Sequence, residues 1–331
     1  MYEKKFHSEP LESYTFLVTG GAGFIGSHIV EYLMKHGAGK VIVLDNLATG
    51  SLDNIRPFLD NPRFEFIKGD IRDYETVREA VNRSDFVSHQ AALGSVPRSV
   101  KDPITTNEVN ISGFLNVLHA VKESPRTRRM VYAASSSTYG DSRELPKKEE
   151  RIGKPLSPYA VTKYVNELYA DVFGRLYGTD TIGLRYFNVF GPRQNPKGPY
   201  AAVIPLFMLA LLRGESPKVH GDGEQTRDFT FVENAVQANI KAFFAPPEAA
   251  NQIYNVAAGK RTSLLELLRL LENISGLAVH PVHTDPRPGD VRDSLADISK
   301  AARLLGYDNI VPLEEGLKIT YDYFRTHESP G

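Results

Sequence analysis

Two side chains suited to act on a hydroxyl group lie in the segment SPYAVTKYVNELYADVF, namely Tyr159 and Lys163. The segment predicts a long helix over 158–177, and residues four apart share one face of a helix, so we expect both side chains to point the same way. A Lys ammonium close to a phenol favours the phenolate and lowers the pKa of the phenol from about 10 toward the working pH. Such a phenolate is a suitable general base for a sugar hydroxyl. Because similar pairs occur on helices without any role, the other motifs of the chain decide what this pair means.

Hydroxyl groups are concentrated in the next motif, ASSSTYG, at residues 134–140. This motif follows a predicted strand, MVYAAS, and therefore lies at the carboxyl end of that strand. Ligands of open parallel sheets bind at that edge, so the hydroxyls are placed to meet a bound substrate. The alternative is a hydroxyl-rich loop that satisfies its own backbone.

A glycine motif, TGGAGFIG, follows a predicted strand and opens a predicted helix. Gly20 would allow a tight turn, Gly23 would let the backbone approach a pyrophosphate, and Gly26 would let the helix pack on its strand. The spacing is Gly-x-x-Gly-x-x-Gly, and alone it is compatible with an ordinary turn. Asp45, however, ends the next strand 19 residues past Gly26, where a carboxylate can accept hydrogen bonds from ribose hydroxyls. The segment LDNLATG holds no Arg for a 2′-phosphate, so the pattern favours NAD over NADP.

Two further strand ends are candidates for the adenine and ribose side of this site. Asp70 closes the third predicted strand, and Ala91 and Ala92 follow the fourth. Each of them is nearly as compatible with an ordinary strand end and tight packing.

The elements that must position these motifs alternate between strands and helices, which is the βαβ pattern. Strands are predicted at 15–20, 40–45, 63–70, 85–92, 130–135 and 181–187, with helices between them, notably at 24–37, 107–122 and 158–177. Right-handed crossovers then give an α/β fold with a doubly wound parallel sheet of the Rossmann type. We expect a cofactor domain at 1–188, to which some later segments return. A smaller mixed α/β substrate lobe at 189–331 has helices at about 203–213, 233–244, 263–275 and 297–305.

Composition excludes several classes of function. The 331 residues include 39 basic and 40 acidic side chains, so nucleic acid lacks an electrostatic driving force for binding. Without an apolar run of about 18 residues we expect no membrane span. The lack of cysteine removes disulfides and thiolate zinc sites and fits the cytoplasm, and nine scattered histidines predict no metal site. Residues 1–13 are expected to form an exposed arm or short helix.

Together the motifs TGGAGFIG, SSSTYG, YAVTK and LRYFNVFGP make the chain resemble, from about residue 14 to 325, the extended short-chain dehydrogenase/reductases and especially the nucleotide-sugar 4-epimerases. The resemblance implies that Tyr159 is the base, that Lys163 holds the nicotinamide ribose and lowers the Tyr pKa, and that Ser135 bonds the reacting hydroxyl. Ser136 and Ser137 are its less certain neighbours. NAD is the implied cofactor, and it should stay bound because no net redox change occurs.

The same resemblance assigns the remaining cofactor contacts. Tyr186 in RYFNVFGP corresponds to a nicotinamide-side contact, although core packing in a buried strand is the alternative. The predicted cofactor-binding residues are Gly20, Gly23, Phe24, Ile25, Gly26, Asp45, Asn46, Asp70, Ile71, Ala91, Ala92, Tyr159, Lys163 and Tyr186.

Substrate contacts are also implied by the resemblance. Arg227 and Arg287 are similar to the family's diphosphate-binding arginines, with Asp290 as a ribose or arginine partner, and planar guanidinium groups suit a pyrophosphate. The predicted substrate-binding residues are Gly94, Ser95, Ser135, Ser136, Ser137, Asn188, Ala202, Val203, Arg227, Arg287, Asp290 and Ser294.

The reaction implied is reversible epimerisation at C4 through a 4-keto sugar. The acid/base pair of related 4,6-dehydratases and the acid of related uronate decarboxylases are absent from the Ser135 loop. Small side chains at Gly94, Ala202 and Ser294 resemble the branch that acts on N-acetylated sugars, because they would leave room for an acetamido group. UDP-N-acetylglucosamine, converted to UDP-N-acetylgalactosamine, is therefore the expected substrate. Close packing is the alternative explanation for these three residues.

Three alternatives stay open. UDP-glucose and UDP-galactose are one alternative pair of substrates. UDP-uronic acids are another, because Arg98 would pair with a C6 carboxylate if it faced the sugar. A non-catalytic NAD-binding sensor is the alternative from another class, although a sensor has no need of Ser135, Tyr159 and Lys163. Related enzymes also imply a homodimer joined through helices 107–122 and 158–177.

Overall fold

The computed structural model describes residues 1–196, 201–285 and 291–327. Seven parallel strands form its main sheet, in the order β11-β6-β5-β4-β1-β2-β3. The strands are β1 Thr15–Thr19, β2 Lys40–Asp45, β3 Phe64–Lys68, β4 Phe86–His89, β5 Arg129–Ser135, β6 Thr181–Tyr186 and β11 Gln252–Val256. The strand order reverses between β1 and β4, and ligands of such sheets bind at that reversal.

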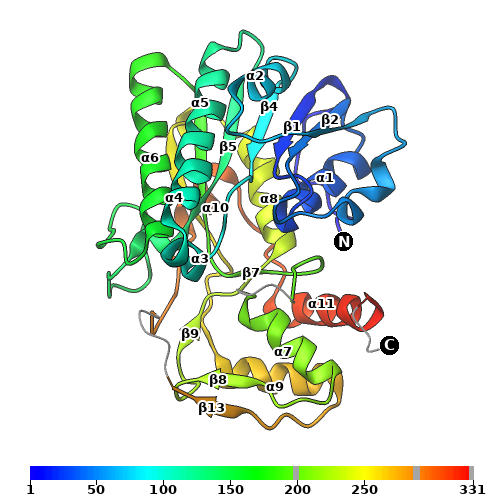
Figure 1. The fold of residues 1–331 in the computed structure, drawn as a ribbon, viewed down its shortest axis with the longest axis vertical. Coiled ribbons are helices and arrows are strands. Elements are labelled where there is room, and N and C mark those ends of the chain that lie inside the picture. Colours follow the sequence, from blue (N-terminus) through cyan, green and yellow to red (C-terminus); the bar gives the residue numbers. More distant parts are fainter. Residues whose placement is uncertain (197–200, 286–290, 328–331) are drawn as a thin grey trace.

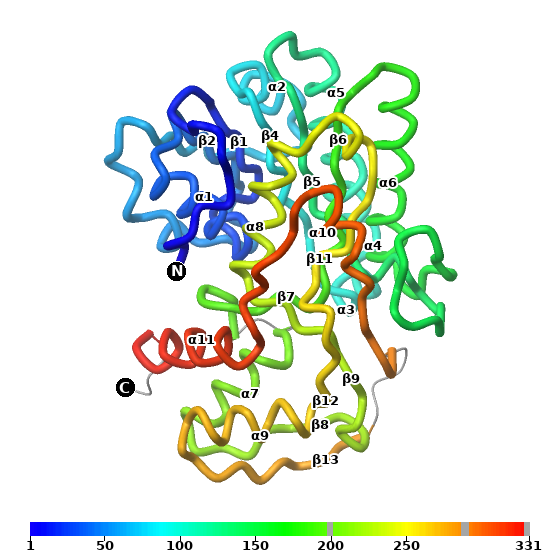
Figure 2. The backbone as a smooth tube through the Cα atoms, turned by 180° about the vertical axis from the view of Figure 1, so that it is seen from behind, coloured from blue at the N-terminus to red at the C-terminus, as the bar shows by residue number. Residues whose placement is uncertain are grey.

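Helices cover both faces of this sheet, which confirms the predicted doubly wound α/β fold (Figure 1). One face carries α1 Phe24–Lys35, α8 Val232–Phe243 and α10 Ser299–Leu305, seen from behind in Figure 2. The other face carries α2 Tyr74–Asn82, α5 Phe114–Glu123 and α6 Pro158–Tyr177. Side chains of a strand alternate between the two faces, so Phe16 and Val18 pack with the first layer while Leu17 packs with the second.

Several elements differ in extent from the sequence prediction. The expected strands 63–70 and 85–92 end earlier, at Lys68 and His89. The expected helix 107–122 is divided into α4 Pro103–Asn107, a π-helical turn at Glu108–Gly113 and α5, and α3 Val96–Lys101 precedes them. β11 is a seventh strand that the alternation pattern did not single out.

The second lobe lies beyond the carboxyl ends of the strands (Figures 1 and 2). Its helices are α7 Val203–Leu212, α9 Leu264–Ser275 and α11 Leu313–His327, of which α11 was not predicted. Its short strands pair as β7 Val189–Phe190 with β10 Thr230–Phe231, β8 Lys218–His220 with β13 Val282–Thr284, and β9 Thr226–Arg227 with β12 Thr262–Ser263. These elements share a core of their own that includes Phe207, Leu267 and Phe324. Among the described residues, no helix combines the length and apolar character needed to cross a bilayer.

Most of residues 1–13 are exposed, and a short 3-10 helix lies at Leu11–Ser13, in line with the predicted exposed arm or short helix. The segment is nevertheless anchored by three buried side chains, Tyr2, Phe6 and Leu11. Tyr2 is fully buried, and Phe6 stacks on Tyr32 with ring centroids 5.1 Å apart. The hydroxyl of Tyr2 lies 2.7 Å from Nδ1 of His28. Aromatic side chains of the arm therefore make apolar and polar contacts with α1, the helix that the glycine motif opens.

Candidate active site

A long cleft lies along the carboxyl ends of the strands, and it collects the predicted cofactor residues with one exception. It is lined by Gly20, Gly23, Phe24, Ile25, Gly26, Asp45, Asn46, Ile71, Ala91, Ala92, Tyr159, Lys163 and Tyr186. Asp70 does not line it, because its carboxylate accepts hydrogen bonds from the Arg72 guanidinium at 2.8 Å and from Asn46 Nδ2 at 2.9 Å. These bonds hold the pKa of Asp70 well below its usual range. Arg72 itself lines the cleft and was missed, because nothing in its local sequence shows that it turns toward the site.

The glycine motif has the geometry that a phosphate-binding turn requires. Gly20 has a φ of +69°, and a Cβ there would lie 2.6 Å from the amide nitrogen of Ala91. A Cβ on Gly26 would lie 2.2 Å from the carbonyl oxygen of Gly20, so only glycine lets α1 begin this close to the turn. Gly23 precedes α1 without a capping side chain, and the first amides of the helix are thus available to an anion in the cleft.

Asp45 occupies the position expected for a ribose contact. Its Oδ2 accepts the amide of Ala22 at 3.0 Å and its Oδ1 accepts the amide of Leu47 at 2.8 Å. Burial raises the pKa of Asp45, and the two amide bonds partly oppose that effect. Each oxygen retains a lone pair, so the fixed carboxylate can still accept bonds from a vicinal diol. The cleft therefore fits a dinucleotide of the NAD type.

Tyr159, Lys163 and Ser135 meet in the same cleft. The backbone amide of Tyr159 donates to Ser99 Oγ at 3.0 Å, and Lys163 Nζ donates to the carbonyl oxygen of Ala133 at 2.7 Å. Ser137 donates to Ser135 Oγ from both its amide, at 3.2 Å, and its hydroxyl, at 2.9 Å. Ser135 thus contacts both its own loop and the tyrosine, with which it forms a further hydrogen bond.

The electrostatics of the pair differ from the expectation. Burial raises the pKa of Tyr159, and the hydrogen bond with Ser135 opposes the rise. Burial lowers the pKa of Lys163 to about 8. The sequence predicted that Lys163 lowers the Tyr159 pKa; the net shift is upward, because desolvation outweighs the hydrogen bond with Ser135, and the Lys163 ammonium is bonded to a backbone carbonyl.

Tyr186 lines the cleft as a buried residue within a polar network. Its hydroxyl accepts from Asn239 Nδ2 at 2.7 Å and donates to Gln90 Oε1 at 3.2 Å. Gln90 lines the cleft as well and was not predicted. His89, expected to be packed, is fully buried with Nδ1 2.8 Å from Thr19 Oγ1, and burial lowers its pKa to about 3.

A second cavity opens from Ser135 away from the cofactor cleft. One part of its wall consists of small residues, namely Ser135, Ser136, Ser137, Gly140, Ser157, Ala160 and Ser294. The rest is formed by larger side chains, namely Val96, Tyr139, Lys147, Leu156, Phe187, Asn188, Arg227, Val291 and Asp293. Ser135 borders both the cleft and this cavity. A group bound here would therefore reach the Tyr159 and Lys163 pair through Ser135.

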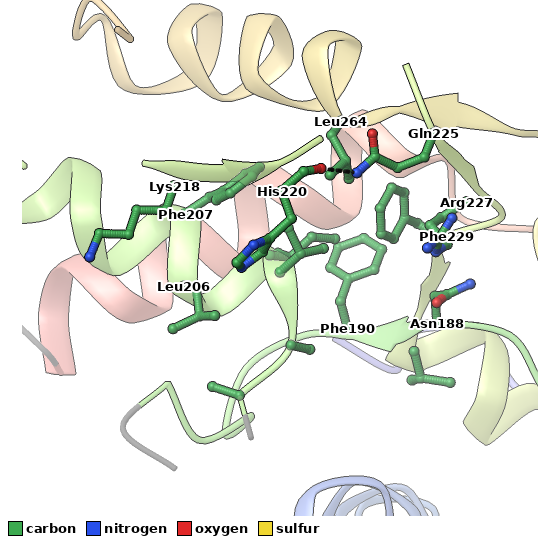
Figure 3. Close-up of a pocket in the computed structure, with 15 residues that line it drawn as sticks. Asn188, Phe190, Leu206, Phe207, Lys218, His220, Gln225, Arg227, Phe229 and Leu264 are labelled. Atoms are coloured by element: carbon green, nitrogen blue, oxygen red, sulfur yellow. Dashed lines mark hydrogen bonds between the residues drawn. The ribbon is translucent and has the colours of Figure 1, made fainter. Parts of the chain in front are cut away.

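A third cavity lies in the second lobe, where Asn188 and Arg227 border one side and His220 and Leu206 the other, with Phe190 between them (Figure 3). Ala202 and Val203 also line it. Asn188 has a φ of +36° and borders all three cavities. The three spaces thus meet at one residue.

The structure does not bring together all predicted substrate residues. Gly94 lines the cofactor cleft, Ala202 the cavity of Figure 3 and Ser294 the cavity beside Ser135, so these three do not surround one space. The Oγ of Ser95 accepts the amide of Arg98 at the start of α3, and neither residue lines the three cavities. Arg287 and Asp290 lie outside the described residues. Among the residues that are described, no group of His, Cys, Asp and Glu side chains is arranged to hold a metal ion.

These features define a dinucleotide-dependent enzyme of the Rossmann class. They are the doubly wound sheet, the glycine turn, the buried carboxylate of Asp45 and the pair of Tyr159 and Lys163. Residues 16–257 match the model of the "NAD dependent epimerase/dehydratase family". The chain belongs to this family, and its cofactor is NAD, which confirms the family and the cofactor that the motifs indicated.

Solved structures of similar proteins cover nearly the whole chain. The UDP-glucose 4-epimerase of Thermotoga maritima with UDP-glucose is 39% identical, with a TM-score of 0.88 over 95% of this chain and 99% of that one. The UDP-N-acetylglucosamine 4-epimerase of Methanobrevibacter ruminantium, in complex with UDP-N-acetylmuramic acid, is 39% identical, with a TM-score of 0.87 over 95% and 99%. The UDP-glucuronic acid 4-epimerase of Bacillus cereus, with UDP-glucuronic acid and NAD, is 32% identical, with a TM-score of 0.88 over 95% and 99%.

Proposed function

We propose that this NAD-dependent UDP-sugar 4-epimerase acts on UDP-N-acetylglucosamine and forms UDP-N-acetylgalactosamine. The observation that carries the proposal is the cavity beside Ser135, in whose wall Ser294 and six other small residues lie among larger side chains. A sugar whose C4 lies at Ser135 would have room in this cavity for an acetamido group. A larger side chain at any of these positions would meet that group at a steric cost.

The catalytic steps rest on three residues of the cleft. Ser135 holds the O4 hydroxyl, and Tyr159 removes its proton because the two side chains are hydrogen-bonded to each other. Lys163 holds the nicotinamide ribose and supplies positive charge beside the tyrosine. When bound, NAD supplies the acceptor and donor of the hydride at C4. The 4-keto sugar turns over between the two half-reactions, and Tyr159 returns the proton to O4.

Binding of the nucleotide diphosphate is proposed for the region where the three cavities meet. Arg227 borders the cavity beside Ser135 and the cavity of Figure 3, so its guanidinium is placed to neutralise a phosphate between sugar and nucleoside. Asn188 supplies an amide at the same junction, and Arg287 and Asp290 complete the proposed set. In this proposal, residues 1–188 with later returning segments hold the cofactor, and the lobe from 189 holds the substrate.

UDP-uronic acids form a second candidate substrate class. The cation that favours them is Lys147, whereas the sequence pointed to Arg98. Lys147 is 4% exposed and lines the cavity beside Ser135, whereas Arg98 does not line it. A buried ammonium in that wall would suit a C6 carboxylate. Lys147 therefore replaces Arg98 as the residue on which this alternative depends.

A homodimer is part of the proposal. Large apolar side chains on the outer side of α6 are exposed, including Leu168 at 47% and Leu176 at 67%, and Ile104 on the neighbouring α4 is 72% exposed. An apolar face of this kind on two adjacent helices suits pairing with a second copy. Light scattering of the purified protein should give about twice the 36.8 kDa chain mass.

The deciding experiment is incubation of the purified protein with UDP-N-acetylglucosamine without added NAD, followed by NMR of the anomeric and H4 protons. We expect UDP-N-acetylgalactosamine at a stable ratio, with no release of NADH, and no product with Tyr159→Phe. No change in this sugar, while UDP-glucose or a UDP-uronic acid does react, would contradict the acetamido assignment. An inactive wild type with all of these sugars, even with NAD supplied, would favour the sensor alternative.

A further inference from the structure

A buried ion pair lies behind the active site and takes no part in the steps above. Glu167 of α6 and Arg185 of β6 form two parallel hydrogen bonds, with Nε to Oε1 at 2.8 Å and Nη2 to Oε2 at 2.7 Å. The side chains are 6% and 3% exposed, respectively. Neither residue lines the cofactor cleft, the cavity beside Ser135 or the cavity of Figure 3. Any effect of the pair on catalysis must therefore pass through other residues.

The first such residue is Lys163. Glu167 follows Lys163 by four positions on α6, so the two side chains lie on one face of the helix, one turn apart. Burial disfavours the charge on Lys163, and the carboxylate of Glu167 is the group that acts in the opposite direction. The other titratable groups facing Lys163 are Tyr159 on the same helix and His89 on β4, and burial keeps His89 neutral. Glu167 thus supplies the negative charge that favours the lysine ammonium.

The second contact leads to the loop that carries Ser135. The guanidinium carbon of Arg185 lies 4.7 Å from the centroid of the Tyr139 ring, and Nη1 donates to the carbonyl oxygen of Glu149 at 3.0 Å. Tyr139 ends the 3-10 turn Ser136–Tyr139 directly after Ser135, and its hydroxyl donates to Asn255 Oδ1 at 2.6 Å. The same arginine therefore contacts Glu167 on α6 and the far end of the hydroxyl loop.

We propose that Glu167 and Arg185 are positioning residues for the reaction: Glu167 fixes the charged Lys163 from one helical turn away, and Arg185 ties Glu167 to the Ser135 loop through Tyr139. The assignment rests on the proposed function of Lys163. Stability alone is a weak explanation for the pair, because replacing a buried ion pair by apolar residues is often neutral or stabilising. If the pair serves to position Lys163, its removal should change the pH at which Lys163 loses its proton.

The test uses the double variant Glu167→Met/Arg185→Met, which removes both charges and leaves neither partner buried alone. The matched control is Arg129→Met/Asp180→Leu. Arg129 and Asp180 also form two parallel bonds, at 2.6 and 2.9 Å, but at the opposite end of β5 from Ser135. Glu167→Asp serves as the conservative variant that keeps the charge.

Two readouts are measured from pH 6 to 10: kcat/KM for UDP-N-acetylglucosamine and the affinity for NAD. We expect the alkaline limb of kcat/KM to move at least one pH unit toward acid in the Glu167/Arg185 double variant, because Lys163 loses its proton more readily. We expect NAD affinity at pH 8.5 to fall at least tenfold relative to wild type. The KM for the sugar nucleotide should change less than twofold, and Glu167→Asp should keep the limb near its wild-type position.

The assignment is overturned if the folded double variant keeps both the wild-type limb and the NAD affinity. It is equally overturned if the Arg129/Asp180 control moves them as far. Melting temperatures establish that each variant is folded. If wild type epimerises no UDP-sugar, the proposed function fails, while the NAD titration still decides whether Glu167 acts on Lys163.

Discussion

The Nζ of Lys163 donates a 2.7 Å hydrogen bond to the carbonyl oxygen of Ala133, two residues before Ser135 on β5. This bond joins α6 to the strand that carries Ser135. Ala133 and Lys163 both line the cofactor cleft, and Ser135 borders this cleft and the cavity next to it. The protein itself thus orients the long lysine side chain, which reduces the entropy that binding would otherwise cost.

Lys163 predicts a defined pH dependence. Its pKa is lowered to about 8, so its ammonium is present below that pH and is lost above it. Activity should therefore decline as the pH rises through about 8, and this alkaline limb of the pH profile should follow the titration of Lys163 alone. Lys163→Met should lower kcat/KM about 100-fold, because the base Tyr159 loses the positive charge beside it, and should abolish this limb. Exposed Lys154→Met is the control, and a limb that persists in Lys163→Met would assign it to another residue.

Gly26 predicts a specific failure of the cofactor turn. In Gly26→Ala the new Cβ would lie 2.2 Å from the Gly20 carbonyl oxygen, which is backbone and cannot swing aside. Displacement of the turn should lower the free energy of unfolding by about 3 kcal/mol and release NAD. Gly94→Ala is the stability control, since a Cβ there meets nothing within 4 Å. Equal unfolding midpoints in urea for the two variants would contradict the close approach at Gly26.

Local patterns sufficed for the parts of the site whose partners are near in sequence. The glycine turn and the Tyr159 and Lys163 pair each lie within eight residues, so local spacing predicted that the members of each set lie together, and both sets line the cleft. Contacts between distant segments were not predictable. Arg72 enters the cleft through its bonds with Asp70 and Glu108, and Tyr2 is buried by partners 26 and 231 residues away. β11 pairs with β6, although part of the second lobe lies between them in the sequence. Nothing in its own residues shows which sheet this short strand joins.

His28 predicts a loss of stability in acid. Its Nε2 donates to the Pro192 carbonyl oxygen at 2.9 Å, and its Nδ1 lies 2.7 Å from the Tyr2 hydroxyl, which donates to it while the ring is neutral. Burial lowers its pKa to about 3 in the folded protein, whereas an unfolded histidine titrates near 6.5. Between those values only the unfolded chain gains the proton. The free energy of unfolding therefore falls as the pH falls, by up to about 1.4 kcal/mol per pH unit for this group.

Urea unfolding of wild type and His28→Gln between pH 7 and 5 measures this contribution. The variant should be less stable at pH 7 but show a shallower dependence on pH. The exposed residue His119, changed to Gln, is the matched control and should keep the wild-type slope. An unchanged slope in His28→Gln would show that the neutral, buried ring does not limit stability in acid.

Ser294 predicts how the choice of sugar can be changed. Its amide donates to the Thr226 carbonyl oxygen at 3.2 Å, a backbone bond that any replacement retains, so its side chain can be enlarged without losing that contact. In Ser294→Tyr the ring would occupy part of the cavity beside Ser135. The kcat/KM for UDP-N-acetylglucosamine should fall about 100-fold, and the kcat/KM for UDP-glucose less than threefold. The reason is that the ring fills the part of the cavity that only the acetamido group would occupy. Ser294→Ala keeps the space open and should retain both activities. If Ser294→Tyr slows both sugars to the same extent, the acetamido group does not lie against Ser294 and the substrate assignment returns to Lys147 and the uronic acids.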